Sequence, residues 1–190
     1  MLRSKLIVTA VATGILGFSG TYACAEEFST RLVGFAENPS ILSDGSGTFK
    51  LLVDKTSRRA KYELTYSGLS TPATQGHIHF ARSRVNGGIF VWLCQSATNP
   101  SPVANTPTCP ADGGTVKGVI TPDSIIAVSA QLITAGDFDA LTDALESKSA
   151  YANVHTTAAP GGEVRGQIHQ GDLDKEHDDN DHHDHGEHKS

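Results

Sequence analysis

Alternating hydrophobic and polar positions run through most of the chain between residues 26 and 170. Residues 59–66 show the pattern most clearly: Tyr62, Leu64 and Tyr66 fall on one face of an extended segment, and Lys61 and Glu63 fall on the other. This period of two is typical of a β-strand with one buried face. Strand-like runs also occupy residues 28–35, 48–53, 75–80, 89–93, 116–120, 151–156 and 163–169.

Turn-forming residues separate these runs. Glycine pairs beside Asn, Asp or Pro stand at residues 87–88, 113–114 and 161–162. Apolar residues recur at helical spacing only over residues 137–146, where Asp137 is placed to cap a helix. Many short strands with a single helix favour an all-β fold, an antiparallel Greek-key-like β-sandwich, over a parallel α/β fold.

The first 25 residues predict a secretory signal peptide. Arg3 and Lys5 precede an uncharged apolar run, and Ala23-Cys24-Ala25 offers the small residues that a signal peptidase reads. We expect cleavage after Ala25 and a periplasmic or secreted protein. The alternative is a lipoprotein with a lipidated Cys24, a signal that the residues before Cys24 match poorly. No later stretch is apolar enough to predict a membrane span.

Two cysteines remain after the signal, Cys94 and Cys109, and the segment between them holds three prolines. In an oxidising compartment such a pair predicts one disulfide at the base of a long loop. Two free, buried thiols are the alternative.

Charge is concentrated at the C-terminal end. The whole chain has 15 basic and 21 acidic residues, and residues 171–190 alone have 8 acidic and 2 basic ones. The body, residues 26–170, is therefore nearly neutral and of a length suited to one domain. A neutral body argues against a nucleic-acid partner, which requires a basic surface. Residues 171–190 are almost without apolar side chains and predict a disordered tail.

Histidines provide the main candidate chemistry of the body. His77 and His79 are two apart in a predicted strand, so both side chains project from one face with α-carbons about 7 Å apart. His155 lies in another strand-like run, residues 151–156, and His169 ends the last run. Imidazole binds copper and zinc well. The pattern predicts a copper or zinc site formed by His77, His79 and His155, with His169 as a fourth candidate. A metal-free network of hydrogen-bonded, structural histidines is the alternative.

The tail, residues 171–190, contains further histidines in a segment that is predicted to be disordered. Its histidines alternate with Asp and Glu, a composition that binds transition metals loosely and predicts metal capture. Its affinity is expected to fall below about pH 6, because a protonated imidazole cannot bind a metal. A solubilising tail is the alternative. The tail histidines are His177, His182, His183, His185 and His188.

The last run has one polar face, formed by Glu163, Arg165 and Gln167. Arg165 is suited to pair with a carboxylate such as Glu163, or to bind a loop carbonyl. A face exposed to solvent is the alternative.

Four segments together resemble the CHRD domain, the module named after chordin. They are GHIHF (76–80), GIFVWL (88–93), YANVHT (151–156) and GGEVRGQI (161–168), and the resemblance extends over residues 31–169. It implies a β-sandwich in an extracytoplasmic setting. In chordin-like proteins these domains belong to an extracellular regulator that binds growth factors. The proline-rich segment between Cys94 and Cys109 departs from the pattern and resembles an insertion.

Three functions follow from these patterns. The first is transition-metal binding by the strand histidines and the tail. The second is an extracytoplasmic protein-interaction module that uses the polar strand face and the Cys94–Cys109 loop. The third is a small copper redox enzyme, by a fold-level analogy with Cu/Zn superoxide dismutase, another antiparallel sandwich with a His-x-His strand. Nucleophile, phosphate-loop and zinc-protease motifs are not present in the sequence. The sequence thus favours a binding protein over an enzyme.

Overall fold

The computed structural model describes residues 25–171 and 173. Residues 1–24 of the predicted signal peptide and all five tail histidines lie outside these residues. The described chain is mostly β, with one α-helix and three short 3-10 helices. Its strands are β1 (Glu26–Val33), β2 (Ser46–Asp54), β3 (Arg59–Ser67), β4 (Ala73–Phe80), β5 (Gly88–Cys94), β6 (Gly114–Ile120), β7 (Ala150–Thr156), β8 (Val164–Gln167) and β9 (His169–Gln170).

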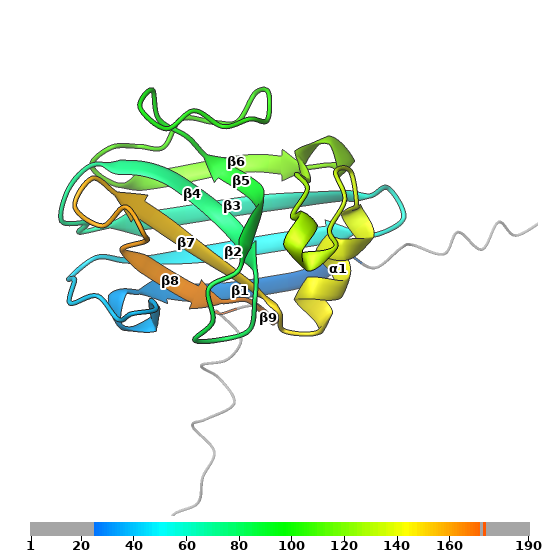
Figure 1. The fold of residues 1–190 in the computed structure, drawn as a ribbon, viewed down its shortest axis with the longest axis horizontal. Coiled ribbons are helices and arrows are strands. Elements are labelled where there is room, and N and C mark those ends of the chain that lie inside the picture. The colour runs from blue at the N-terminus through cyan, green and yellow to red at the C-terminus, as the bar shows by residue number, and fades with distance from the viewer. Residues whose placement is uncertain (1–24, 172, 174–190) are drawn as a thin grey trace, which may run out of the picture.

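The strands form one antiparallel sheet that folds over on itself. Their order is β5-β4-β7-β8-β1-β2-β3-β6, and β9 also pairs with β1. Figure 1 shows β4, β5, β7 and β8 as one layer in front of β1, β2, β3 and β6. The layers join where β8 meets β1, through the single pair Val33↔Arg165. The predicted antiparallel sandwich is confirmed.

The core fills the space between the two layers. In β3, Tyr62, Leu64 and Tyr66 are buried, whereas Lys61 and Glu63 of the same strand are not. This is the alternation that the sequence predicts. Strand β7 differs, because all seven of its residues are buried. Both faces of β7 are therefore covered, one by the core and the other by loops.

The helix α1 (Phe138–Glu146) begins where the sequence predicts. The Asp137 side chain accepts a hydrogen bond from the Ala140 backbone N–H at 3.0 Å and so caps the first turn. The apolar face of the helix, including Phe138, Leu141 and Leu145, belongs to the core. In Figure 1 the helix lies at one end of the sandwich.

Cys94, at the end of β5, is disulfide-bonded to Cys109, so the predicted pairing is confirmed. The bond closes the proline-rich loop beside the sheet. Both cysteines are buried, at 0% and 4% exposure. Within the described residues no helix has the length and apolar character needed to cross a membrane.

One predicted strand is divided in two. The run 163–169 folds as β8 and β9, which are separated by Ile168. Ile168 is fully buried, and its N–H donates to the Ala150 carbonyl at 2.9 Å. The break allows β8 to pair with β7 while β9 pairs with β1.

Candidate metal centre

The three body histidines meet because β4 and β7 are antiparallel neighbours. Their register places His77 opposite Asn153, His79 opposite Tyr151, and Gln75 opposite His155. Side chains of directly opposite residues share a face, and that face continues at every second residue. His77, His79, Tyr151, Asn153 and His155 therefore all project from the side of the sheet that faces away from the core.

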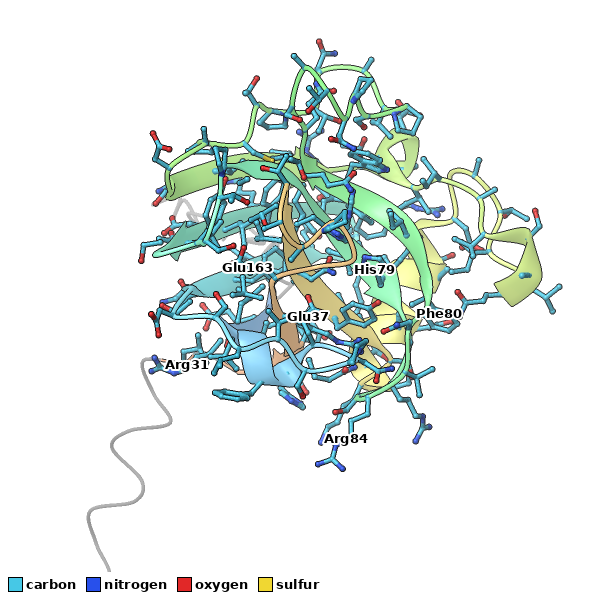
Figure 2. All side chains as sticks on the ribbon, turned by 60° about the vertical axis from the view of Figure 1, so that its left-hand side comes forward. Arg31, Glu37, His79, Phe80, Arg84 and Glu163 are labelled. Carbon is cyan, nitrogen blue, oxygen red and sulfur yellow. A yellow bond between two sulfur atoms is a disulfide. The ribbon has the colours of Figure 1, made fainter. Side chains whose placement is uncertain are left out.

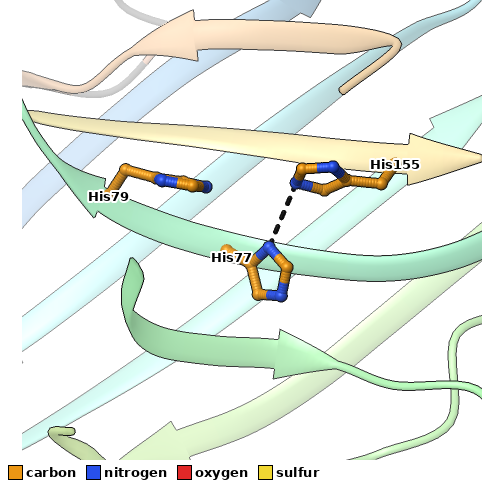
Figure 3. A group of neighbouring side chains, drawn as sticks. All are labelled: His77, His79 and His155. Carbon is orange, nitrogen blue, oxygen red and sulfur yellow. Dashed lines mark hydrogen bonds between the residues drawn. The ribbon is translucent and has the colours of Figure 1, made fainter. Parts of the chain in front are cut away.

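One ring nitrogen from each histidine converges on a common region. These three nitrogens all lie within 4.8 Å of one another. Nδ1 of His77 is 3.1 Å from Nε2 of His155, as the dashed line in Figure 3 marks. The ring of His79 points toward that of His155 from the other side in the same view.

All three rings are removed from solvent, with exposures of 0% for His77, 6% for His79 and 5% for His155. Burial disfavours the charged imidazolium, so it lowers the pKa of each ring. The pKa falls to about 2 for His77 and to about 4 for His79, and that of His155 is also lowered. The three histidines are therefore neutral near pH 7, as a metal ligand has to be.

Backbone carbonyls determine which nitrogen carries the proton in two of the rings. Nδ1 of His79 lies 2.9 Å from the Gly87 oxygen, and Nδ1 of His155 lies 2.9 Å from the Pro160 oxygen. A carbonyl oxygen only accepts, so each Nδ1 carries the hydrogen and donates it. Each Nε2 consequently keeps a lone pair directed at the common region, and the Nε2 lone pair of His155 accepts a hydrogen bond from Nδ1–H of His77.

Two aromatic side chains contact the rings of His77 and His79. The ring of His77 contacts Trp92 edge-on, with ring centroids 4.3 Å apart, and His79 stacks on Tyr151 at 4.6 Å with nearly parallel planes. Nε2 of His77 is buried, and within the described part of the chain it has no hydrogen-bond partner. Trp92 is the single tryptophan of the chain.

Asn153 lies between the two histidines whose tautomers are determined. Its Oδ1 is 3.1 Å from Nε2 of His79 and 3.0 Å from Nε2 of His155. On the opposite side, its Nδ2 donates to Oε1 of Glu37 at 3.5 Å. Gly162 makes room for this contact, because a side chain at that position would collide with the Glu37 carboxyl group and the Asn153 amide.

Glu37 is a buried acid with 7% exposure. Burial raises its pKa to about 7, although the nearby Arg165 charge and hydrogen bonds from Asn153 and the Asn38 backbone act in the opposite direction. Figure 2 shows Glu37 and His79 within the molecule, whereas Arg31 and Arg84 point outward.

The chain matches the model of the CHRD domain over residues 28–168, a range that contains every residue of this cluster. It belongs to the CHRD family. The family resemblance that the sequence predicts is confirmed. No curated protein and no solved structure matches the chain.

The polar face formed by Glu163 and Arg165, at the start of β8 in this CHRD domain, is buried, so the alternative of a solvent-exposed face is wrong for these two charged residues. Glu163 and Arg165 are each 1% exposed, and residues of the loops before β2, between β3 and β4, and after β4 contact them. Arg165 binds loop carbonyls, which was predicted as the alternative to a pair with a carboxylate. It donates to the Val85 oxygen at 2.8 Å and to Oδ1 of Asn86 at 3.0 Å. Its guanidinium lies 3.3 Å from the centre of the Tyr151 ring.

Glu163, just before β8, and Gln167, its last residue, also link separate segments of the chain. Glu163 accepts hydrogen bonds from the Ser43 hydroxyl, from the Ser70 backbone and hydroxyl groups, and from the Thr156 hydroxyl, at 2.6–2.7 Å. Gln167 donates from Nε2 to the carbonyl oxygens of Ala81, Lys148 and Ala150.

His169, the fourth ligand candidate, is not part of the cluster. It lies in β9 opposite Ser29 and is exposed. Ile168 interrupts the strand just before it, so His169 does not continue the face on which Arg165 lies.

The sequence interpretation missed Asn153, Trp92, Tyr151 and Glu37. Period-two spacing from His155 places Asn153 and Tyr151 on its face, but Trp92 and Glu37 come from other elements and carry no such signal.

Proposed function

We propose that the protein is an exported CHRD-domain protein that binds one transition-metal ion, copper or zinc, through His77, His79 and His155. The observation that carries the proposal is the set of tautomers. Backbone carbonyls accept the Nδ1 hydrogens of His79 and His155, and this leaves two Nε2 lone pairs directed at one region beside Nδ1 of His77. A metal ion there would replace the Nδ1 hydrogen that His77 shares with His155.

This pattern matches the way proteins prepare histidine ligands. A ligating histidine commonly donates its second N–H to a carbonyl or carboxylate, which orients the ring. Zinc–imidazole bonds are about 2.0–2.1 Å long, so two ligands on one ion lie about 3.3 Å apart in tetrahedral geometry. The shortest nitrogen–nitrogen distance here is 3.1 Å, and all three lie within 4.8 Å of one another. An ion in tetrahedral geometry would draw the most distant pair together by up to about 1.5 Å.

The tail is proposed to collect metal ions, and the folded site to bind one of them. The disulfide supports export, because structural disulfides persist in oxidising compartments. Both the periplasm and the extracellular space meet that condition.

Trp92 provides a direct test on the full chain. Its ring contacts His77, so Cu²⁺ at the three-histidine site should quench the intrinsic fluorescence of this one tryptophan. We expect saturable quenching with one equivalent at that site, and displacement of copper by excess Zn²⁺. Calorimetry should report additional, weaker binding, which a variant with all five tail histidines replaced by alanine loses.

Two single variants give the matched comparison. His79→Ala should abolish the quenching, and His169→Ala should leave it unchanged, because His169 is exposed and lies outside the cluster. Circular dichroism and the unfolding midpoint establish that each variant is folded. Equal quenching in wild-type protein and His79→Ala would contradict the proposal, as would copper binding that disappears entirely with the tail histidines.

A protein-interaction module is the second candidate, and one observation favours it. A groove of about 520 Å³ crosses the outer surface of β1, β2, β3 and β6. Leu52 and Val119 are 39% and 41% exposed there, and Lys61, Glu63 and Lys117 flank them. Under this alternative the histidines are structural, and a chelator changes neither the unfolding midpoint nor partner binding.

The redox-enzyme hypothesis requires that the copper-loaded protein turns over superoxide or peroxide and that His77→Ala removes this activity.

A further inference from the structure

The oxygen of the Asn153 amide lies at hydrogen-bonding distance from two ring nitrogens that have no hydrogen to donate. This oxygen faces Nε2 of His79 and Nε2 of His155, at 3.1 and 3.0 Å. Both nitrogens present lone pairs, because their rings carry the hydrogen on Nδ1. An amide oxygen against two lone pairs is repulsive. The side chain is 2% exposed, so solvent does not relieve the contact.

Two arrangements remove the repulsion. In the first, the amide is rotated by half a turn, so that Nδ2 donates to both imidazoles and Oδ1 faces Glu37. In the second, a cation would lie among the three nitrogens and the oxygen and accept all four electron pairs, with the hydrogen of His77 carried on Nε2 instead of Nδ1. In the structure the amide oxygen faces the two imidazoles and Nδ2 faces Oε1 of Glu37, which is the orientation that the second arrangement requires.

We propose that Oδ1 of Asn153 is the fourth ligand of the metal site, and that this ligand makes the site selective for a divalent ion over Cu⁺. The proposal rests on the proposed function, since it requires the three-histidine site to bind metal. It adds an oxygen ligand and an order of preference among ions.

The coordination number supplies the selectivity. Zn²⁺ is almost always four-coordinate in proteins, and Cu²⁺ prefers tetragonal sites with nitrogen and oxygen ligands. Cu⁺ is a softer ion, which gains little from an amide oxygen and is satisfied by three imidazoles. Asn153 therefore contributes to the binding of Zn²⁺ and Cu²⁺ much more than to the binding of Cu⁺.

Glu37 makes the Asn153 oxygen a stronger ligand through its hydrogen bond with Nδ2 of the same amide. Three imidazoles and an amide bring no negative charge, and the buried guanidinium of Arg165 is close by, stacked on Tyr151. A carboxyl group that accepts from Nδ2 increases the electron density on Oδ1 of the same amide, as carboxylates do behind ligating histidines. Glu37 is thus a positioning residue, not a ligand.

The test measures Zn²⁺ and Cu⁺ affinities of the full chain by competition with chromophoric chelators, under anaerobic conditions for Cu⁺. The five tail histidines are replaced by alanine in all samples, so that only the folded site is titrated. We expect Asn153→Ala to weaken Zn²⁺ binding by about 10- to 100-fold and to change Cu⁺ binding by less than threefold. Asn153→Asp keeps the shape and adds charge, and it should strengthen Zn²⁺ binding.

Co²⁺ is the spectroscopic probe of coordination. Its visible absorption should change in energy and intensity on Asn153→Ala, because an amide oxygen is lost from the ion, whereas a merely structural role leaves the spectrum as in wild-type protein. Equal weakening of Zn²⁺ and Cu⁺ by Asn153→Ala, or an unchanged Co²⁺ spectrum, would overturn the proposal. Failure of the proposed function is distinct, because wild-type protein and His79→Ala would then bind equally.

Discussion

Replacing Glu37 by glutamine should stabilise the metal-free protein, and more so as the pH rises. Glu37 is almost fully buried, and its pKa is raised from 4.5 to about 7 because burial disfavours the carboxylate. In the unfolded chain the group ionises near its ordinary pKa. The folded state therefore prefers the protonated acid, and ionisation at higher pH opposes folding.

The sign and size follow from this shift. A pKa raised on folding contributes stability that is fully present below about pH 4.5 and is lost as the pH rises through about 7. A shift from 4.5 to about 7, at 1.36 kcal/mol per unit, corresponds to about 3 kcal/mol. Glutamine has nearly the same shape and never ionises. Glu37→Gln should thus match wild-type protein near pH 4 and exceed its stability by about 3 kcal/mol at pH 8.

Urea unfolding of both proteins with EDTA, from pH 4 to pH 8, measures this difference, and Trp92 fluorescence reports the transition. The unfolding temperature of Glu37→Gln should be higher by roughly 10 °C at pH 8. Glu63→Gln is the control, because the Glu63 side chain is 44% exposed and forms a surface ion pair with Lys117. A stability difference between wild-type protein and Glu37→Gln that does not vary with pH would refute the reasoning.

Two further variants test the buried polar contacts and the loop. Glu163→Gln should lower the free energy of unfolding by about 2 kcal/mol, because it weakens hydrogen bonds from three segments. The control Glu63→Gln should change this free energy by less than about 0.5 kcal/mol. Urea unfolding at pH 7 compares the two variants, and equal effects would contradict the role of Glu163. Replacing Cys94 and Cys109 together by serine should lower the same free energy by about 3 kcal/mol through loop entropy. A comparison of unfolding midpoints measures this, and an unchanged midpoint would show that the loop needs no covalent closure.

The sequence by itself determined the features that depend on neighbours along the chain. Alternation located strands such as β3, and helical spacing with a capping aspartate located α1. The same local geometry put His77 and His79 on one face, because side chains in any strand repeat every two residues. The cysteine pair was predictable because only two cysteines follow the predicted signal peptide.

The tertiary structure decided what surrounds those faces. A polar face of a strand looks the same in sequence whether water or a loop covers it, so the burial of Glu163 and Arg165 was not predictable. His169 was placed with the other histidines because the alternation appears unbroken, but the buried Ile168 divides that strand.

The partners of the histidines depended on the tertiary structure most of all. The β4–β7 register places Asn153 opposite His77, and the 3-10 segment after β1 carries Glu37 to the far side of the Asn153 amide. The carbonyls that set the tautomers belong to Gly87 and Pro160, in two separate loops. Strand periodicity reports the direction of a side chain but not which distant segment it meets, since strand pairing and loop coverage are set by the packing of the whole domain.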